Sequence, residues 1–302
     1  MSAAPTVEVM PSVWRDLWRD RLARTCLVVV ALYAVMALYG EAVYQWHQWN
    51  DTTPGYQVQH LDQRFEPPGR AYWMGTDALG RDVFSRLLQG ARIAFRVGII
   101  TSLIAIPIGV LLGSLAGYFG GRVDAAIVWL YSTFAAIPGL LFILAIAMIA
   151  GKGLLGVYLG IGLTMWVGVC RLIRAEVMKQ RAMPYVMAAR VLGYSHTRIL
   201  FRHILPNVSH VIIVAFTLRF PASIGTEVFM SFLGLGVQGE PSWGVMINNA
   251  RLRLWQGVWW EMTFVTLAVL LIVLAFNLLG DALRDALDPR VRTRATHSAA
   301  AR

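Results

Sequence analysis

The apolar residues of this 302-residue chain are gathered into stretches of about twenty, separated by basic connectors that are rich in Gly and Pro. A helix of that length spans the hydrocarbon core of a bilayer and pairs its own backbone polar groups there. Only 15% of the residues are charged, against about 25% in an ordinary soluble domain. The sequence therefore predicts an all-α, polytopic membrane protein.

Six membrane-spanning helices are predicted. The third has no charged residue, but it contains Pro138, which predicts a kink because proline removes a helical hydrogen bond. The first is longer than the apolar core of a signal peptide and no cleavage motif follows it, so we expect a retained anchor. The six spans lie at residues 26–46, 97–119, 125–150, 154–170, 208–234 and 262–280.

The positions of the basic residues predict the orientation of these spans. With six crossings, 17 of the 27 Lys and Arg residues fall on the side of the two termini, and nine fall on the other side. Short cytoplasmic segments carry the excess of positive charge, so both termini are expected to be cytoplasmic. The chain then divides into a cytoplasmic tail (1–25), a first helix (26–46), a periplasmic loop with an amphipathic helix (47–96), a five-helix core with a cytoplasmic loop at 171–206 (97–280) and a second cytoplasmic tail (281–302).

Several tryptophans are expected to lie together at the outer membrane interface. Indole rings have an apolar body and a polar N–H group, and they are enriched where lipid meets water. The residues expected in this aromatic belt are Trp46, Trp49, Trp255, Trp259 and Trp260.

Motifs for catalysis or metal binding do not occur in the sequence. The run Gly151-Lys152-Gly153 lacks the spacing and the hydroxyl of a phosphate-binding loop, so the chain is expected not to hydrolyse ATP. No zinc-protease or serine-hydrolase motif occurs, and Cys26 and Cys170 are interpreted as structural thiols. Three histidines recur at intervals of seven, and for them a helix face is favoured over a metal site: His196, His203 and His210.

A stripe of small residues marks the second span. Gly109, Gly113 and Gly117 recur at intervals of four, which places them on one side of a helix. Such a stripe lets another helix approach closely. The partner is either another helix of the same chain, which we favour, or a helix of another subunit.

Two carboxylates precede this span in the outer loop. Asp77 can cap a turn, and Asp82 lies near the start of the amphipathic helix. A carboxylate at that end complements the helix dipole. Both are therefore expected to have structural roles.

The cytoplasmic segment 171–206 has the pattern of two short helices joined by a turn. Pro184 suits the first turn of a helix, and Gly193 suits the left-handed residue that ends it. Ser195 can cap a second helix, which runs to Pro206, where the next span opens. A basic loop resting on anionic lipid is the alternative.

Within this segment, Ala188-Ala189, Gly193 and Leu205-Pro206 resemble the EAA loop of permease subunits in binding-protein-dependent ABC importers. The resemblance implies that the loop docks into a groove on the ATPase. Met187 stands where the family has glutamate and His203 where it has an aliphatic residue, so the charge contact credited to the glutamate is not implied. The coupling residues implied in this way are Met187, Ala188, Ala189, Gly193, Leu205 and Pro206.

Further motifs resemble the second permease subunit of dipeptide and oligopeptide importers. Two of them run from Gly75 to Arg86 and from Gly280 to Pro289. The run from Ser231 to Gly236, with Trp243-Gly244 after it, resembles the outer loop of the same family. The resemblance implies a periplasmic gate or binding-protein contact at Gly234, Gly236, Trp243 and Gly244, and structural roles for Gly75, Asp77, Gly80, Arg81, Asp82, Asp281, Arg284, Asp285, Asp288 and Pro289.

The resemblance identifies the chain as a permease subunit with the fold of type I ABC importers. It implies a heterodimer with a homologous permease subunit, which forms the pathway for dipeptides or oligopeptides in the bacterial inner membrane. Two ABC ATPase subunits, which bind the ATP, and a periplasmic or lipid-anchored binding protein are the other implied protein partners. Membrane lipids surround the chain, and no cofactor, metal or nucleic acid is expected. Nickel chelates, glutathione or another small solute are alternative substrates.

Acidic residues near the end of the last predicted span need an explanation. Asp281, Asp285 and Asp288 lie near a helix C-terminus, where the helix dipole disfavours a carboxylate. We expect cationic partners for them, either the nearby Arg284 and Arg290 or the basic residues of the 171–206 loop. Direct contact with the ATPase is the alternative.

Two ionisable residues, Arg219 and Glu227, lie inside the fifth span. A charge that faces lipid costs about 3 kcal/mol or more, so both are expected to face protein or a wet cavity. Their separation on a helix, about 12 Å and 80°, argues against mutual pairing. Each either bonds a polar group on a neighbouring helix or lines the pathway. A self-sufficient secondary carrier, the alternative class, should show inverted repeats, and none is evident.

Overall fold

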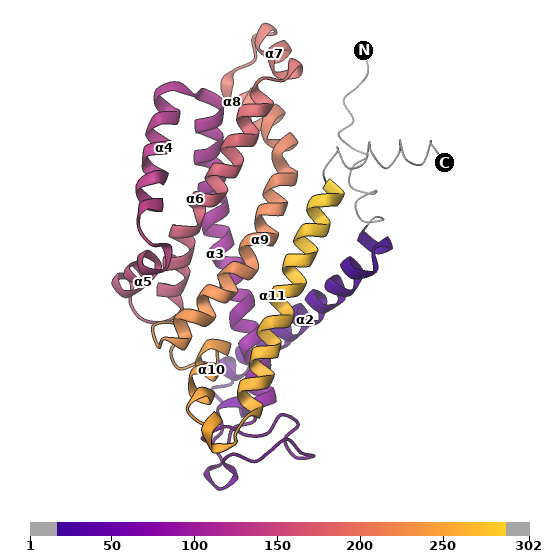
Figure 1. Ribbon diagram of the computed structural model, residues 1–302, viewed down its shortest axis with the longest axis vertical. Helices are drawn as coiled ribbons and strands as arrows, with labels where there is room; N and C mark the ends of the chain where they lie inside the picture. The colour runs from indigo at the N-terminus through magenta and orange to yellow at the C-terminus, as the bar shows by residue number, and fades with distance from the viewer. Residues whose placement is uncertain (1–16, 288–302) are drawn as a thin grey trace.

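The computed structural model describes residues 17–287, which fold into helices with one isolated β-bridge, between Thr76 and Asp82 (Figure 1). The long helices are α2 (Arg21–Trp49), α3 (Val83–Phe119), α6 (Leu154–Arg181), α9 (Leu205–Phe232) and α11 (Trp260–Leu287). The shorter ones are α4 (Gly121–Ala136), α5 (Gly139–Ala150), α7 (Pro184–Val191), α8 (His196–Arg198) and α10 (Trp243–Arg251). Short 3-10 turns span Gly55–Gln57, Leu61–Gln63 and Leu254–Gln256, and a π-helix spans Ile199–Ile204.

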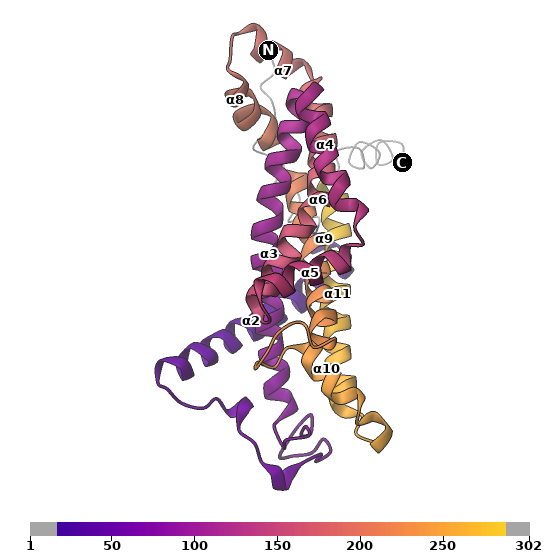
Figure 2. The same cartoon turned by 90° about the vertical axis from the view of Figure 1, so that its left-hand side faces the viewer.

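The membrane spans follow from helix length and hydropathy. Within residues 17–287, five helices are long and apolar enough to cross a bilayer, and six spans result when α4 and α5 count as one bent pair. The long helices form an elongated bundle, whereas α2 crosses it obliquely and projects from it at its C-terminal end (Figure 1 and Figure 2). The predicted all-α membrane architecture is confirmed.

Pro138 breaks the third predicted span. Helices α4 and α5 meet there at 90°. The N–H of Ile137 still donates to the Phe134 carbonyl (3.4 Å), whereas Pro138 has no N–H group and caps the start of α5. The predicted kink is confirmed, and it redirects the chain.

Helix α3 unites two elements that were predicted separately, the outer amphipathic helix and the second span. The Asp82 carboxylate caps this 37-residue helix by accepting hydrogen bonds from the N–H groups of Phe84 (3.3 Å) and Ser85 (3.0 Å), as predicted. Gly120 follows the last residue with a φ of +67°. The elements merge because a change from amphipathic to apolar composition does not itself end a helix.

Helix α6 continues past the predicted end of the fourth span to Arg181. Its last turns are polar but consist largely of good helix formers. Arg174 on this extension forms a bidentate ion pair with Asp124 of α4, with 2.7 Å between Nη2 and Oδ2. The extension is therefore part of the bundle.

The glycine stripe of α3 packs against α6 of the same chain. A Cβ atom added at Gly113 would lie 2.6 Å from the Cys170 carbonyl oxygen, and one at Gly117 would lie 2.7 Å from the Arg174 carbonyl oxygen. Gly109 faces Val169 in the same way. The favoured interpretation, packing within the subunit, is confirmed.

The second cytoplasmic helix is not separate from the fifth span. Ser195 caps α8 as predicted, but α8, the π-helix and α9 run on as one helix from His196 to Phe232. Pro206 falls in the first turn of α9, which follows the π-helix directly. Pro206 therefore opens α9, as predicted, although the helix before it continues into α9 without a break.

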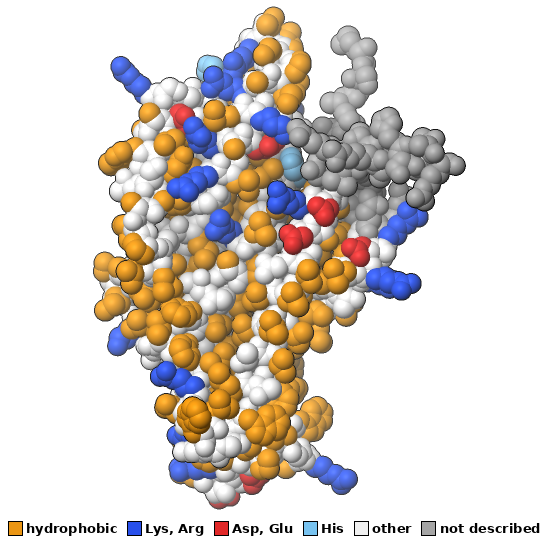
Figure 3. Space-filling model, in the orientation of Figure 1, with side chains coloured by type: hydrophobic (Ala, Val, Ile, Leu, Met, Phe, Trp, Pro, Cys, Tyr) orange, Lys and Arg blue, Asp and Glu red, His pale blue; other side chains and the backbone are white. Residues whose placement is uncertain are grey.

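Four of the five belt tryptophans are exposed: Trp46, Trp49, Trp255 and Trp259. Trp260 is different, because it is buried and its indole N–H donates to the Thr76 carbonyl (3.0 Å). Its place in the belt is corrected accordingly. Figure 3 shows apolar side chains over much of one face, with more Lys and Arg toward the end that carries α7.

Candidate functional site

Helix α7 and the turn after it form one tip of the bundle, at the end opposite α10 (Figure 1). Pro184 occupies the first turn of α7, as predicted. Gly193 has a φ of +75° and its N–H donates to the Arg190 carbonyl (3.0 Å). The predicted left-handed turn is confirmed. Val186 and Ala189 hold the tip in place because they are buried in an apolar cluster against α6 and α9.

The predicted coupling residues divide between the surface of this tip and its interior. Met187 is 55% exposed, and its neighbours Val191 and Leu192 are 88% and 70% exposed. Ala188, Gly193 and Pro206 are exposed as well, whereas Ala189 is buried and Leu205 half-buried. An exposed apolar patch of this kind marks a contact surface, either with another protein or with the membrane.

Tyr118, at the end of α3, connects this tip to the bundle. Its hydroxyl lies 2.9 Å from Nδ1 of His196, and its carbonyl accepts a hydrogen bond from Arg181 (3.0 Å). The Arg190 guanidinium lies 5.6 Å from the centre of its ring. Sequence reasoning missed Tyr118, because a tyrosine at the end of a span looks like an ordinary interfacial residue.

The three histidines spaced at sevens occupy helical positions and do not converge. His196 meets Tyr118, whereas His203 stacks on Tyr194 with 5.5 Å between ring centroids. Residues 17–287 hold no group of His, Cys, Asp or Glu side chains suited to a metal ion. These contacts favour the helix-face interpretation.

The motif from Gly75 to Arg86 forms a buried turn around Asp77. This carboxylate accepts hydrogen bonds from the N–H groups of Leu79 (2.8 Å) and Arg81 (3.0 Å), so the predicted turn cap is confirmed. It also pairs with the Arg81 guanidinium, with 2.7 Å between Oδ2 and Nε, and lies 3.4 Å from Nε of Arg86. The turn thereby fixes the loop before α3 to the start of this helix.

Two glycines of this motif adopt a backbone conformation that disfavours other residues. Gly75 and Gly80 have φ values of +73° and +70°. A Cβ atom at Gly80 would overlap the His60 carbonyl, and one at Gly75 would lie 2.7 Å from the Trp260 indole nitrogen. These contacts fit the structural role that was predicted.

The α9–α10 corner contains the predicted gate glycines. Gly234 turns the chain with a φ of +77°, whereas Gly236 and Gly244 allow close approach to Ser231 and Val228 at the end of α9. The corner is therefore tightly folded.

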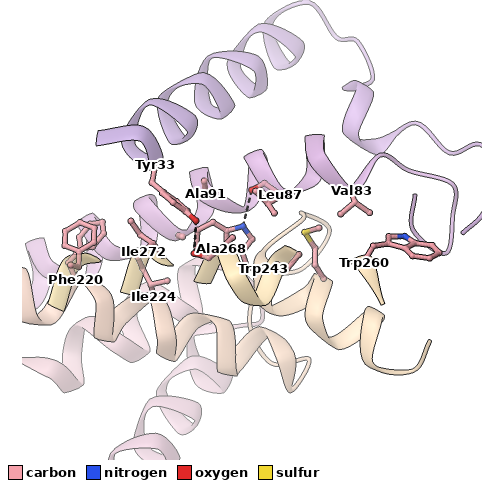
Figure 4. Close-up of a cluster of buried hydrophobic side chains, with 14 of the residues drawn as sticks. Tyr33, Val83, Leu87, Ala91, Phe220, Ile224, Trp243, Trp260, Ala268 and Ile272 are labelled. Carbon is pink, nitrogen blue, oxygen red and sulfur yellow. Dashed lines mark hydrogen bonds between the residues drawn. The ribbon is translucent and has the colours of Figure 1, made fainter. Parts of the chain in front are cut away.

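Trp243 is enclosed at this corner and is not an exposed anchor for a binding protein. Its side chain is 1% exposed, and its indole N–H donates to the Leu87 carbonyl of α3 (3.1 Å). The ring meets Tyr33 edge-on, with 6.0 Å between centroids, and Gly90 leaves room for it (Figure 4). The prediction is corrected because Trp243 lies on the face of α10 that packs on α3.

The two ionisable residues of the fifth span have different surroundings. Glu227 is 1% exposed and accepts a hydrogen bond from the Ser231 hydroxyl (2.7 Å), which itself accepts one from the N–H of Val237 (3.0 Å). Arg219 is half-buried, and its guanidinium fills the space beside Gly168 of α6. They form no ion pair with each other, as expected. The enclosure of Glu227 favours a structural role.

Asp281, Arg284 and Asp285 lie on exposed positions of the last turns of α11. Across the described part of the chain, the two carboxylates have no ion-pair partner. The predicted pairing with Arg284 or with the 171–206 loop is therefore not seen there. Asp288, Pro289 and Arg290 lie outside the described residues.

The fold is that of a polytopic membrane protein, and one tip of it carries exposed apolar side chains. Residues 109–293 match the family described as binding-protein-dependent transport system inner membrane component, and the chain belongs to this family. It is a permease subunit of an ABC importer and resides in the inner membrane. It is not an enzyme and carries no cofactor, because ATP is bound by partner ATPase subunits. A binding protein is the other implied partner.

Relatives that match over nearly the whole chain include two peptide permeases. The dipeptide transport system permease DppC of Bacillus subtilis is 38% identical over 95% of this chain and 88% of its own. The oligopeptide permease OppC of the same organism is 34% identical over 93% of this chain and 91% of its own. The glutathione permease GsiD of Pectobacterium atrosepticum is 38% identical over 93% of this chain and 92% of its own.

A solved transporter supports the fold. The MetNI methionine ABC transporter, in an inward-facing conformation, contains a chain that matches with a TM-score of 0.52. The match covers 67% of this chain and 94% of that chain, at 16% sequence identity. The helices are therefore arranged as in an ABC importer permease.

Replacing Trp243 with Ala should destabilise the protein. Losing a buried ring of this size costs about 3–5 kcal/mol, and the Leu87 carbonyl also loses its donor. The thermal unfolding midpoint of the purified complex in detergent measures this loss. Trp255→Ala is the matched control, because Trp255 is 94% exposed and its loss should leave the midpoint unchanged. Equal midpoints for both variants would contradict the buried role of Trp243.

Proposed function

We propose that this chain, paired with a homologous permease subunit, forms the pathway through which an ATP-driven importer takes up dipeptides or oligopeptides. The observation that carries the substrate class is its identity of 34–38% to dipeptide and oligopeptide permeases over at least 93% of its length. Glutathione is a second candidate, because the glutathione permease GsiD is 38% identical. Glutathione is itself a short peptide, so these relatives support one class of small, peptide-like solutes.

The proposed complex contains two ABC ATPases and a periplasmic or lipid-anchored binding protein. We assign the ATPase contact to the tip formed by α7 and the Gly193 turn. Met187, Val191 and Leu192 give this tip an apolar surface that suits a groove in a partner protein. The tip continues through α8 and the π-helix into α9, so movement of the ATPase would reach a membrane span without an intervening loop.

The outer face is the proposed side of the binding protein. We assign the gate to the α9–α10 corner, with Gly234, Gly236 and Gly244 as the residues that shape it. Trp243 contributes by holding α10 on α3 rather than by direct contact. The exposed ring of Trp255 near this end offers contact area at little entropic cost.

Reconstitution of the full importer in liposomes tests the proposed function. We expect a labelled dipeptide, tetrapeptide or glutathione to accumulate only when both ATP and the binding protein are present. Competition among the three solutes then ranks them. Accumulation without ATP would indicate a secondary carrier, and ATP-dependent uptake of none of the three would reject the peptide assignment.

Gly193→Val should uncouple ATP hydrolysis from uptake. A β-branched residue at a φ of +75° strains the turn by about 1 kcal/mol or more, which shifts the apolar tip in its groove. Uptake per ATP hydrolysed is the measurement. Gly193→Asn is the matched control, because Asn tolerates the left-handed region. Normal coupling in an assembled Gly193→Val complex would contradict the coupling role.

Arg219 is the remaining pathway candidate, whereas Glu227 is expected to support the α9–α10 corner. Arg219→Leu should leave assembly and ATPase activity intact but reduce uptake, because a cation on the pathway wall would attract the carboxylate end of a peptide. Glu227→Gln should lower the amount of assembled complex instead. Size-exclusion chromatography and uptake assays separate the two effects. Normal uptake in the Arg219→Leu complex would remove Arg219 from the pathway.

A further inference from the structure

A buried cation, Arg92, joins three elements at the outer end of the bundle. Its side chain is 1% exposed on α3. Its Nη2 pairs with the carboxylate of Glu240, in the loop between α9 and α10. Its guanidinium carbon also lies 3.8 Å from the centre of the Tyr44 ring on α2. The cation therefore holds the α9–α10 loop against α3 and α2.

A second carboxylate lies next to this cation. Arg96, about one turn further along α3, pairs with Oε1 of Glu41 on α2 and lies 5.4 Å from the centre of the same Tyr44 ring. The Tyr44 ring therefore lies against the guanidiniums of both Arg92 and Arg96, and Arg96 binds Glu41. Glu41 is thus a second carboxylate in this region, and the ion pair between Arg92 and Glu240 does not use it.

Both Arg92 and Glu41 have side-chain atoms that make no hydrogen bond within the described residues. Nε and Nη1 of Arg92 are buried and have no hydrogen-bond partner within the described residues. Oε2 of Glu41 is buried and unpartnered in the same sense. Buried polar atoms of this kind are rare in folded proteins, and each one calls for a physical explanation. Two donors and an acceptor thus lie unused in one small region.

The two partners of the ion pair differ in what they can do. Glu240 is 19% exposed in a loop, so it can move into water. Arg92 lies on helix α3 and its side chain is buried in the bundle, so it cannot move into water with the loop. Leaving a buried guanidinium without a counter-charge is strongly unfavourable. Movement of the loop therefore requires a replacement carboxylate for Arg92.

We propose that Arg92 is a two-partner latch for the α9–α10 loop. In this structure it holds the loop through Glu240, and it transfers to Oε2 of Glu41 when the loop moves away during transport. Arg92 is thus a positioning residue for the outer end of the pathway. The proposal rests on the proposed function, because it assigns a mechanism to the loop expected to gate that pathway.

The latch predicts different effects for the two carboxylates. Glu240→Gln removes the holding partner, so the loop should be released at rest. Glu41→Gln removes the receiving partner, so the loop should stay held even when ATP is bound. An ion pair that served only stability would give the same kind of defect for both variants, namely a less stable complex.

Amide hydrogen exchange of residues 233–242 in the assembled importer tests this difference. We expect wild-type exchange to rise when the complex is trapped with ATP and vanadate. Glu240→Gln should raise exchange at rest about fivefold or more, fivefold being the lower end of a typical coupling between two states. Glu41→Gln should match wild type at rest and show no rise on trapping. Glu66→Gln is the control, because Glu66 has no ion-pair partner in residues 17–287.

A double variant in which Arg92 and Glu240 swap their charges distinguishes a latch from an ion pair with a purely structural role. Arg92→Glu combined with Glu240→Arg should restore slow exchange at rest. It should not restore the rise on trapping, because a glutamate at position 92 cannot bind Glu41. Complete rescue in both states would overturn the latch, and so would wild-type behaviour of Glu240→Gln and Glu41→Gln.

The outcomes also distinguish failure of the latch from failure of the proposed function. If both carboxylate variants behave as wild type while Gly193→Val still uncouples peptide uptake, the latch is wrong and the function stands. If the wild-type complex imports no peptide, the proposed function is rejected. The exchange measurements still decide on the latch in that case, because they do not depend on the substrate.

Discussion

Close contact between α3 and α6 is the interaction on which the other helices depend. Lipid provides no hydrophobic force that drives helices together, so van der Waals contact between closely spaced backbones has to hold them. Gly109, Gly113 and Gly117 make this possible, because their missing side chains leave the α6 backbone within contact distance. Helix α9 packs on both members of this pair, α2 packs on α3, and α5 packs on α6. Helix α11 then packs on α2 and α9.

Helix α3 also links the two ends of the molecule that carry the candidate sites. Its first turns bear Arg92 and receive the Trp243 indole, and its last turn bears Tyr118, which contacts the tip that carries α7 and the Gly193 turn. A helix of 37 residues is about 55 Å long. Pro107 lies inside it without ending it. A displacement applied at Tyr118 would therefore reach the α9–α10 corner through one continuous element.

The sequence was informative where a signal is local and uninformative where a contact is distant. Asp82 and Gly193 were predicted correctly, because a helix cap and a left-handed turn depend on a few neighbouring residues. The spans were found from hydropathy, and the amphipathic helix expected to lead into the second span is continuous with it in α3. Trp243 and the Arg92 ion pair were unpredictable from pattern, since their partners lie about 150 residues away. An amphipathic ring looks the same in sequence whether it is buried or exposed.

The right angle at Pro138 has a consequence for what can surround the chain. The N–H groups in the first turn of α5 have no carbonyl acceptors in a preceding helical turn. Figure 1 places this break partway along the bundle rather than at its end, and Ile137 beside it is 41% exposed. Irregular backbone at membrane depth is tolerated only where it lies against protein or lines a wet cavity. Acyl chains therefore cannot solvate this corner, and in the assembled importer it has to face another subunit or water.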